Sequence, residues 1–308
     1  MPILDVKRDK MIHAIRALAL AALVAFAPVS QQPEPRPSAA SDARTRDVYV
    51  SVLDSKDAPI TGLAAADFSV KEDGAAREVL RAGPATAPLQ LILLVDDSEA
   101  MTPALQPMRE GLTKFVDKMQ GHGEIGIVTV AERATSLVPS TTDANALKRG
   151  ITRIFARSGA GAYMLDGIDE VSKGFQKRKA ERPVIVALSM EGIEFSNLQY
   201  DNVLKTLAAS GAALHVLSIG SPNRSMTDEW RNLNMVIAEG TKDSGGRRDQ
   251  VLAISGIPEA LLRVANELNN QYVVTYGRPE RLVPPEKIQV TVSRPGVTVR
   301  ARTKVSGK

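Results

Sequence analysis

A short run of acidic and hydroxyl residues, Asp96-Asp97-Ser98-Glu99, directly follows the apolar stretch Leu89–Val95. An uninterrupted apolar stretch of that length is typical of a strand covered on both faces, as in a parallel sheet. Open α/β sheets bind their ligands beyond the carboxyl ends of such strands. These side chains therefore mark the first place where the chain could do chemistry.

The residues that most catalytic chemistries need are missing from this sequence. No cysteine occurs, which excludes disulfides, thiol nucleophiles and cysteine-bound zinc. The only histidines are His13 near the N-terminus, His122 in a glycine turn and His215 inside an apolar strand, a position typical of a core residue. Neither a Gly-x-Ser-x-Gly elbow nor a Gly-x-Gly-x-x-Gly turn follows the first buried strand. We therefore expect a protein that is not an enzyme.

Alternating strand and helix patterns surround the acidic run and must position it. After Leu89–Val95, apolar residues recur at three- and four-residue steps over residues 105–119, which predicts a helix. Further buried strands are predicted at Ile125–Val130, Val184–Leu188 and Ala213–Ile219, with helices between them. This alternation predicts an α/β fold with a doubly wound, mostly parallel sheet.

Two β-rich segments flank the predicted α/β core. On the N-terminal side, Val48–Val52 alternates, and a second strand from Phe68 ends in the hairpin signal Asp73-Gly74. On the C-terminal side, residues 271–304 return to strand patterns. Neither segment can bury much surface alone, so we expect both flanks to form one small β subdomain. The predicted organisation is 47–86 and 271–304 for this subdomain and 87–268 for the α/β domain.

These features resemble the von Willebrand factor A family, specifically its secreted bacterial type. That family carries Asp-x-Ser-x-Ser after the first strand, where this chain has Asp96-Asp97-Ser98-Glu99-Ala100. The flanks also resemble it, in Phe68-Ser-Val-Lys-Glu-Asp-Gly74 and in the segment that begins at Asn270-Gln-Tyr272. The resemblance implies a fold like that of Rossmann domains and a metal-ion-dependent adhesion site (MIDAS), in which Mg²⁺ bridges to an acidic group of a partner.

The implied metal site is degenerate in this chain. Asp96 and Ser98 match family ligands, whereas Ala100 and Ala162 stand where a serine and a threonine are expected. In the last loop, Glu191 is the only residue that can replace the usual aspartate. Mg²⁺ requires octahedral oxygen ligands and tolerates such losses badly. We therefore expect no cofactor, with weak Mg²⁺ binding at Asp96, Ser98 and Glu191 as the alternative.

The N-terminus has the features of an export signal. Basic residues up to Arg16 precede the apolar run Ala17–Ala27, and a polar segment follows. We expect residues 1–30 to be a signal peptide, with an anchoring helix as the alternative, and residues 31–46 to be a proline-rich linker. Half of the net charge of +4 lies in residues 1–30, so the remainder is too weakly basic to predict nucleic-acid binding.

The sequence thus predicts an exported protein-binding module, periplasmic or extracellular, which meets the membrane only through its transient signal peptide. The expected contact surface is the rim of the crevice at the strand ends. Its predicted residues are Asp96, Asp97, Ser98, Glu99, Ala162, Glu191 and Glu194. A cation-dependent adhesion protein with an incomplete site is the alternative function.

A phosphorylated receiver domain is a remote further alternative, because Ile92–Met101 also resembles the start of one. That interpretation needs an aspartate after a later strand, where Ala131-Glu132 stand. No motif in the sequence specifies the partner or the oligomeric state.

Overall fold

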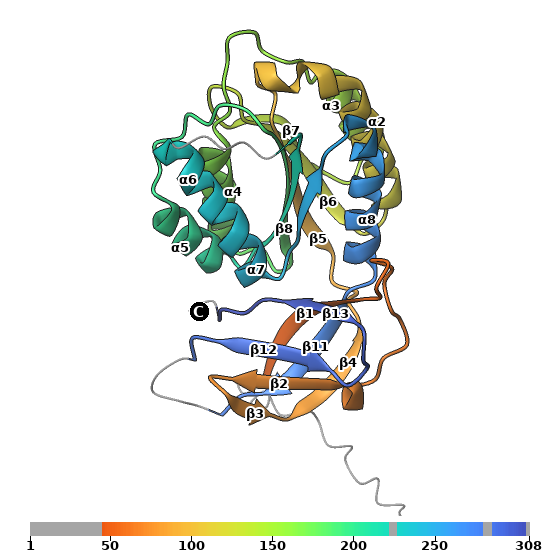
Figure 1. Ribbon diagram of the computed structural model, residues 1–308. Helices are drawn as coiled ribbons and strands as arrows, with labels where there is room; N and C mark the ends of the chain where they lie inside the picture. The colour runs from red at the N-terminus through yellow and green to blue at the C-terminus, as the bar shows by residue number, and fades with distance from the viewer. Residues whose placement is uncertain (1–44, 222–226, 280–284, 306–308) are drawn as a thin grey trace, which may run out of the picture. The chain divides into compact units, whose positions relative to one another are not determined.

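The computed structural model describes residues 45–221, 227–279 and 285–305, and Figure 1 shows it as a ribbon. The predicted signal peptide and nearly all of the predicted linker lie outside these residues. Two parts share the described chain, an α/β layer and a smaller β subdomain (Figure 1). Within the described ranges, no helix combines the length and the apolar character that crossing a membrane requires.

A six-stranded sheet in the order β10-β9-β8-β5-β6-β7 forms the centre of the α/β layer. All of its strands are parallel except β7, which pairs antiparallel with β6 at one edge. Nearly every residue of β5 is buried, as its apolar sequence predicts for a strand covered on both faces. The strands are β5 (Leu89–Val95), β6 (Gly123–Thr129), β7 (Thr135–Thr141), β8 (Pro183–Met190), β9 (Ala213–Ile219) and β10 (Arg248–Val251).

Helices cover both faces of this sheet and bury separate apolar clusters against it. One cluster joins the sheet to α2, α3 and α8, and the other joins it to α4, α5 and α6. The helices are α2 (Leu105–Lys118), α3 (Ala144–Thr152), α4 (Met164–Arg178), α5 (Tyr200–Ser210), α6 (Asp228–Met235), α7 (Thr241–Ser244) and α8 (Ile257–Asn269). A π-helical segment, Val236–Gly240, joins α6 to α7. The predicted doubly wound α/β fold is confirmed.

Both flanks of the chain build the β subdomain, as predicted. A four-stranded sheet has the order β13-β1-β11-β4, and a three-stranded sheet has the order β12-β2-β3. Their inner faces share one apolar core, which includes Val50, Phe68 and Tyr272. The strands are β1 (Thr45–Leu53), β2 (Phe68–Glu72), β3 (Ala75–Arg77), β4 (Val79–Pro84), β11 (Tyr272–Gly277), β12 (Ile288–Val292) and β13 (Thr298–Ala301).

The hairpin signal at Asp73-Gly74 has the conformation that its residues favour. Both residues have positive φ, 47° and 82°, as a tight turn between β2 and β3 requires. A 3₁₀ turn precedes the helix that the sequence predicts over residues 105–119. Thr102 lies in a 3₁₀ turn, Glu99–Ala104, and its hydroxyl donates to the Glu99 carbonyl, so α2 begins only at Leu105.

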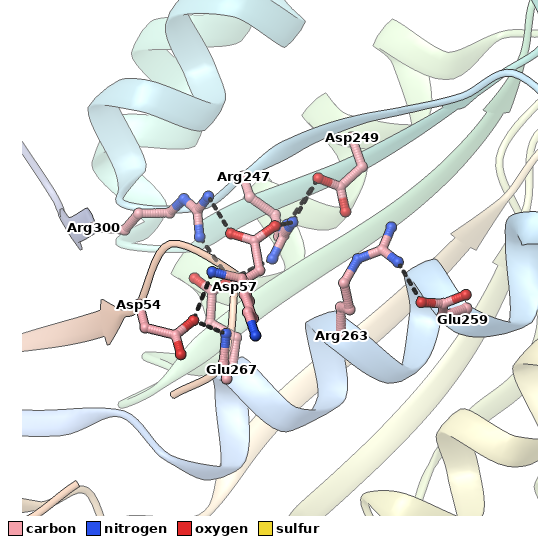
Figure 2. A network of polar contacts seen from close by, with 10 residues as sticks. Asp54, Asp57, Arg247, Asp249, Glu259, Arg263, Glu267 and Arg300 are labelled. Carbon is pink, nitrogen blue, oxygen red and sulfur yellow. Dashed lines mark hydrogen bonds and ion pairs between the residues drawn. The ribbon is translucent and has the colours of Figure 1, made fainter. Parts of the chain in front are cut away.

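A buried ion network connects the two parts (Figure 2). Arg247, which precedes β10, bonds to Glu267 on α8, to Asp249 on β10 and to Asp57 of the β subdomain, at distances of 2.7–3.1 Å. Arg300 on β13 bonds to the same Glu267 at 3.0 Å. The N-terminal ends of the parallel strands therefore lie toward the β subdomain, which leaves their C-terminal ends at the opposite end of the layer (Figure 1).

Candidate functional site

The C-terminal ends of β5, β6, β8 and β9 bring the predicted site residues into one group of loops. Isolated β-bridges, which are formed by backbone hydrogen bonds, join these loops. One pairs Ser98 with Arg157, and two others pair Ala162 with Ala131 and with Glu194. Five of the seven predicted rim residues, namely Asp96, Asp97, Ser98, Ala162 and Glu194, are buried, while Glu99 is exposed and Glu191 half-buried. These five buried residues therefore lie beneath the exposed surface of the loops and support its conformation.

The Asp96 carboxylate is fully buried at the end of β5. One oxygen accepts from the Ser98 backbone N–H at 2.9 Å, and the other accepts from the Met190 backbone N–H at 3.0 Å. Burial raises the pKa of this carboxyl, and the two backbone bonds and the Ser98 side chain act against that shift. Asp96 thus ties the loop after β5 to the end of β8.

The neighbouring Asp97 has both carboxylate oxygens engaged. One accepts from the Ala131 backbone N–H at 2.6 Å, and the other pairs with the Arg157 guanidinium at 3.1 Å. Glu99 lies at the surface, where it accepts from the Gly159 backbone N–H at 2.9 Å. The loop that follows α3 is therefore held against the loop that follows β5 by carboxylates.

Glu194 is 7% exposed, and its carboxylate turns inward onto the first turn of α4. The oxygens accept from the backbone N–H groups of Met164 and Leu165 at 3.2 and 3.3 Å, and Ser196 bonds to the same carboxylate. Desolvation nevertheless dominates and raises the pKa of Glu194 to about 7. The first amides of α4, which have no partner inside the helix, are satisfied in this way.

Glu191 lies one residue beyond Met190 at the end of β8. Its backbone N–H donates to the Ile219 carbonyl of β9 at 2.8 Å. With Ala162, Glu194 and Trp230 it lines a hollow of only 20 Å³. Small-molecule sites typically measure about 300–1,000 Å³. The hollow is thus too small for an ordinary substrate.

The residues present do not fit the Mg²⁺ ion that the fold resemblance implies. Both Asp96 oxygens are taken by backbone donors, and Ala100 and Ala162 have no side-chain oxygen to offer. Within the described ranges, no group of three or more His, Cys, Asp or Glu residues could hold a metal ion. An octahedral ion would need six oxygens here.

Large apolar side chains on these loops and after β10 are exposed. Ile193 and Phe195 flank the predicted rim residue Glu194, whereas Phe155 and Leu252 lie outside the segments that the sequence predicts for the rim. The exposed fractions are 68% for Ile193, 44% for Phe195, 63% for Phe155 and 69% for Leu252. In residues 193–196, apolar and polar side chains alternate as they would in a strand with one buried face, but the polar residues Glu194 and Ser196 are the buried ones. That alternation was the available signal, although it does not show which face is buried.

Comparisons with known proteins identify the α/β layer. Residues 91–191 match the family model described as the von Willebrand factor type A domain. No curated protein sequence matches the chain. The family model covers the strands β5–β8 and the loops that carry Asp96, Ala162 and Glu191, so the protein contains a von Willebrand factor type A domain.

Several solved structures are similar to this chain. A von Willebrand factor type A protein from Catenulispora acidiphila has 11% identity and a TM-score of 0.49, over 85% of this chain and 74% of that one. Proximal thread matrix protein 1 from the mussel byssus has 15% identity and a TM-score of 0.49, over 60% of this chain. The matched part spans about half of the mussel chain, 49%. The von Willebrand factor domain of a type V pili tip protein from Porphyromonas gingivalis has 11% identity and a TM-score of 0.46, over 60% of this chain and 96% of that one.

Proposed function

We propose that the von Willebrand factor type A domain of this protein is a non-catalytic protein-binding module that contacts its partner without a metal bridge. The contact surface is the rim formed by the loops at the C-terminal ends of the parallel strands. Its partner is a protein met after export, in the periplasm or outside the cell, in line with the signal peptide that the sequence predicts.

The observation that carries this proposal is the rigid display of Ile193 and Phe195. The Ile193 carbonyl accepts from the Ala162 N–H at 2.9 Å, and the Phe195 N–H donates to the Ala162 carbonyl at 2.8 Å. Between them, Glu194 is anchored on α4. Because the backbone is held on both sides and the two apolar side chains are exposed, a partner that binds them has little further loop backbone to order.

Other exposed apolar side chains extend this surface. Phe155 is held in place by Arg109, whose guanidinium carbon lies 4.8 Å from the ring centre. The Phe195 ring lies across Gly161, where a Cβ atom would come within 2.0 Å of it. Exposed, well-supported aromatic side chains are frequent energetic anchors of protein interfaces. Leu252, after β10, marks the far end of the same face.

The chemistry of the loops supports binding over catalysis. A general acid or base must reach a substrate atom within hydrogen-bond distance. The carboxylates of Asp96, Asp97 and Glu194 are buried and already engaged by backbone donors or by Arg157. Their common effect is to fix the loops in one conformation, which preorganises the apolar surface above them.

The alternative function, cation-dependent adhesion, lacks a comparable observation. It requires oxygen ligands that face an open position, whereas both Asp96 oxygens bond to backbone N–H groups. The two functions make opposite predictions for a chelator, because only a metal bridge is lost with EDTA.

The test is partner capture from the exported fraction with the purified protein as bait. We expect Ile193→Ser combined with Phe195→Ser to abolish capture of specific proteins that the wild type retains in EDTA. The matched control is Leu80→Ser, which removes an apolar side chain with 48% exposure from β4, far from the rim. Capture that survives the double substitution, or that disappears in EDTA, would contradict the proposal.

A further inference from the structure

A second region with unassigned binding potential lies where α7 meets the β subdomain. One cavity of 350 Å³ opens between α5 and the π-helical segment Val236–Gly240. Another, of 430 Å³, opens between α7 and the strands β2 and β12. Asp243 and Lys304 line both, and their 2.5 Å salt bridge stands at the junction. We call the two cavities together the α7 groove.

The first cavity has an apolar floor made by one face of α5. Leu204, Leu207 and Ala208 line it, together with Gly240 of the π-helical segment. A Cβ atom at Gly240 would come within 3.2 Å of Leu207 and of Leu214, so glycine allows the π-helical segment to lie directly against α5. Local π-helical geometry is rare and is frequently found at functional sites.

The second cavity is lined by cations that have no acidic partner. Lys71, Lys242 and Lys287 are exposed and form no salt bridge with any residue in the described ranges. The two acidic residues beside them are already occupied. Asp73 accepts from the backbone N–H groups of Glu286 and Lys287, and Asp243 bonds to Lys304 and Thr303. Both aspartates keep their charge, but together with Lys304 the lysines that line this cavity outnumber them by four to two, so this end of the α7 groove carries a net positive charge.

We propose that the α7 groove binds an anionic amphiphile, a small molecule with an apolar chain and a carboxylate or phosphate head. The apolar chain would lie on the α5 floor, and the head would lie among Lys71, Lys242 and Lys287. Charge complementarity selects the sign of the head, and the two volumes fall in the range of about 300–1,000 Å³ typical of small-molecule sites. Such sites occur preferentially where two structural parts meet, as they do here.

The groove is separate from the rim in both place and chemistry. The rim lies at the C-terminal ends of the strands, whereas the groove lies on α5, α7 and the β subdomain, and the residues that line the two are different. The inference therefore does not depend on the proposed protein-binding function, and either can fail alone.

The test is isothermal titration calorimetry of the full chain with probes of equal chain length, all below their critical micelle concentrations. The probes are dodecanoate, dodecyl phosphate and dodecyltrimethylammonium. We expect one saturable site per chain for at least one anionic probe, and binding at least about tenfold weaker for the cationic probe. The two anionic arms show whether a carboxylate or a phosphate head is preferred. Equal binding of all three probes, or none, would overturn the proposal.

Substitutions locate the site. Lys242→Glu with Lys287→Glu should weaken the anionic probe about tenfold or more, because two exposed charges are reversed. Ala208→Phe should weaken it by filling the apolar cavity, and circular dichroism checks that each variant is folded. The matched control is Lys177→Glu, an exposed lysine on α4 away from the groove. Binding that is lost instead in the Ile193→Ser and Phe195→Ser variant would assign the probe to the rim and refute the groove.

Discussion

The Arg247 guanidinium and the Glu267 carboxylate form a 3.0 Å salt bridge in which the side chains are only 3% and 1% exposed. Arg247 also bonds to Asp249 and to Asp57, while Arg300 bonds to the same Glu267 oxygen (Figure 2). The opposing carboxylates raise the pKa of Arg247 against the effect of its burial, so the guanidinium stays charged at any physiological pH. One arginine thus holds β10, α8 and the β subdomain together.

Replacing Arg247 with leucine should destabilise the protein by about 3–5 kcal/mol, because the buried Glu267 and the largely buried Asp249 each lose a charged partner. Urea unfolding of wild type and variant measures the difference. Asp57 contributes less to this cost, since its side chain is 39% exposed and water screens the pair.

A double-mutant cycle separates the ion pair from simple loss of packing. The variant with both Arg247→Leu and Glu267→Leu should be more stable than the sum of the two single losses predicts, because neither member of this pair is left buried without the other. The control is Arg231→Leu, whose partner Asp228 is 78% exposed and whose loss should change stability by less than about 0.5 kcal/mol. Additive losses in the cycle would show that the Arg247–Glu267 pair is not coupled.

The strand and helix order could be predicted from the sequence because it depends on local apolar periodicity. Leu89–Val95 is buried on both faces as its composition requires, and Asp73-Gly74 forms the turn that its residues favour. The Arg247 network could not be predicted, because Asp57 and Glu267 lie 190 and 20 residues away from Arg247 in the sequence. Only the packed fold brings them together.

The sequence predicts which loops lie together at the carboxyl ends of the strands, but it does not predict in which direction the side chains on those loops point. These loops follow from the topology, since parallel strands place their carboxyl ends together. The inward turn of Glu194 depends on the bridge between Ala162 and Glu194 and on the free amides of α4, which no local pattern encodes. The outward display of Ile193 and Phe195 follows from that same bridge.

Glu194 should make the protein less stable as the pH rises. Its pKa is about 7 in the folded state, against 4.5 for an unperturbed side chain, so the folded protein binds the proton more tightly than the unfolded chain. The stabilising effect of the proton is complete below pH 4.5 and is lost as the pH rises to 7, a change of about 3 kcal/mol. Glu194→Gln should remove this loss, so its stability relative to wild type should be higher at pH 8 than at pH 4.5. Parallel stability profiles for the two proteins would contradict the assignment.

His215 should have the opposite effect on the acidic side. It is fully buried in β9, neither ring nitrogen has a hydrogen-bond partner among the described residues, and desolvation lowers its pKa to about 4. The unfolded chain binds the proton more tightly, so stability falls as the pH drops from 6.5 toward 4. Glu267 and Asp249 favour the charged ring, whereas Arg247 and Arg300 oppose it. We expect the stability of His215→Leu relative to wild type to rise as the pH drops through this range, as measured by thermal melting of both proteins. A variant that is as acid-sensitive as wild type would show that His215 does not titrate on unfolding.

Divalent cations should leave the thermal stability of the protein unchanged. At millimolar concentration, an ion whose dissociation constant is tens to hundreds of times lower than that concentration would stabilise the fold by about 1–3 kcal/mol. Such binding would need several oxygen ligands besides Asp96, but Ala100 and Ala162 have no side-chain oxygen, and each Asp96 oxygen already accepts from the Ser98 or the Met190 amide. Melting curves with Mg²⁺, Mn²⁺ and Ca²⁺ should therefore overlay the curve with chelator, for wild type and for Asp96→Asn alike. A shift that is present in wild type and absent in Asp96→Asn would instead establish a working cation site and favour cation-dependent adhesion over a metal-free rim.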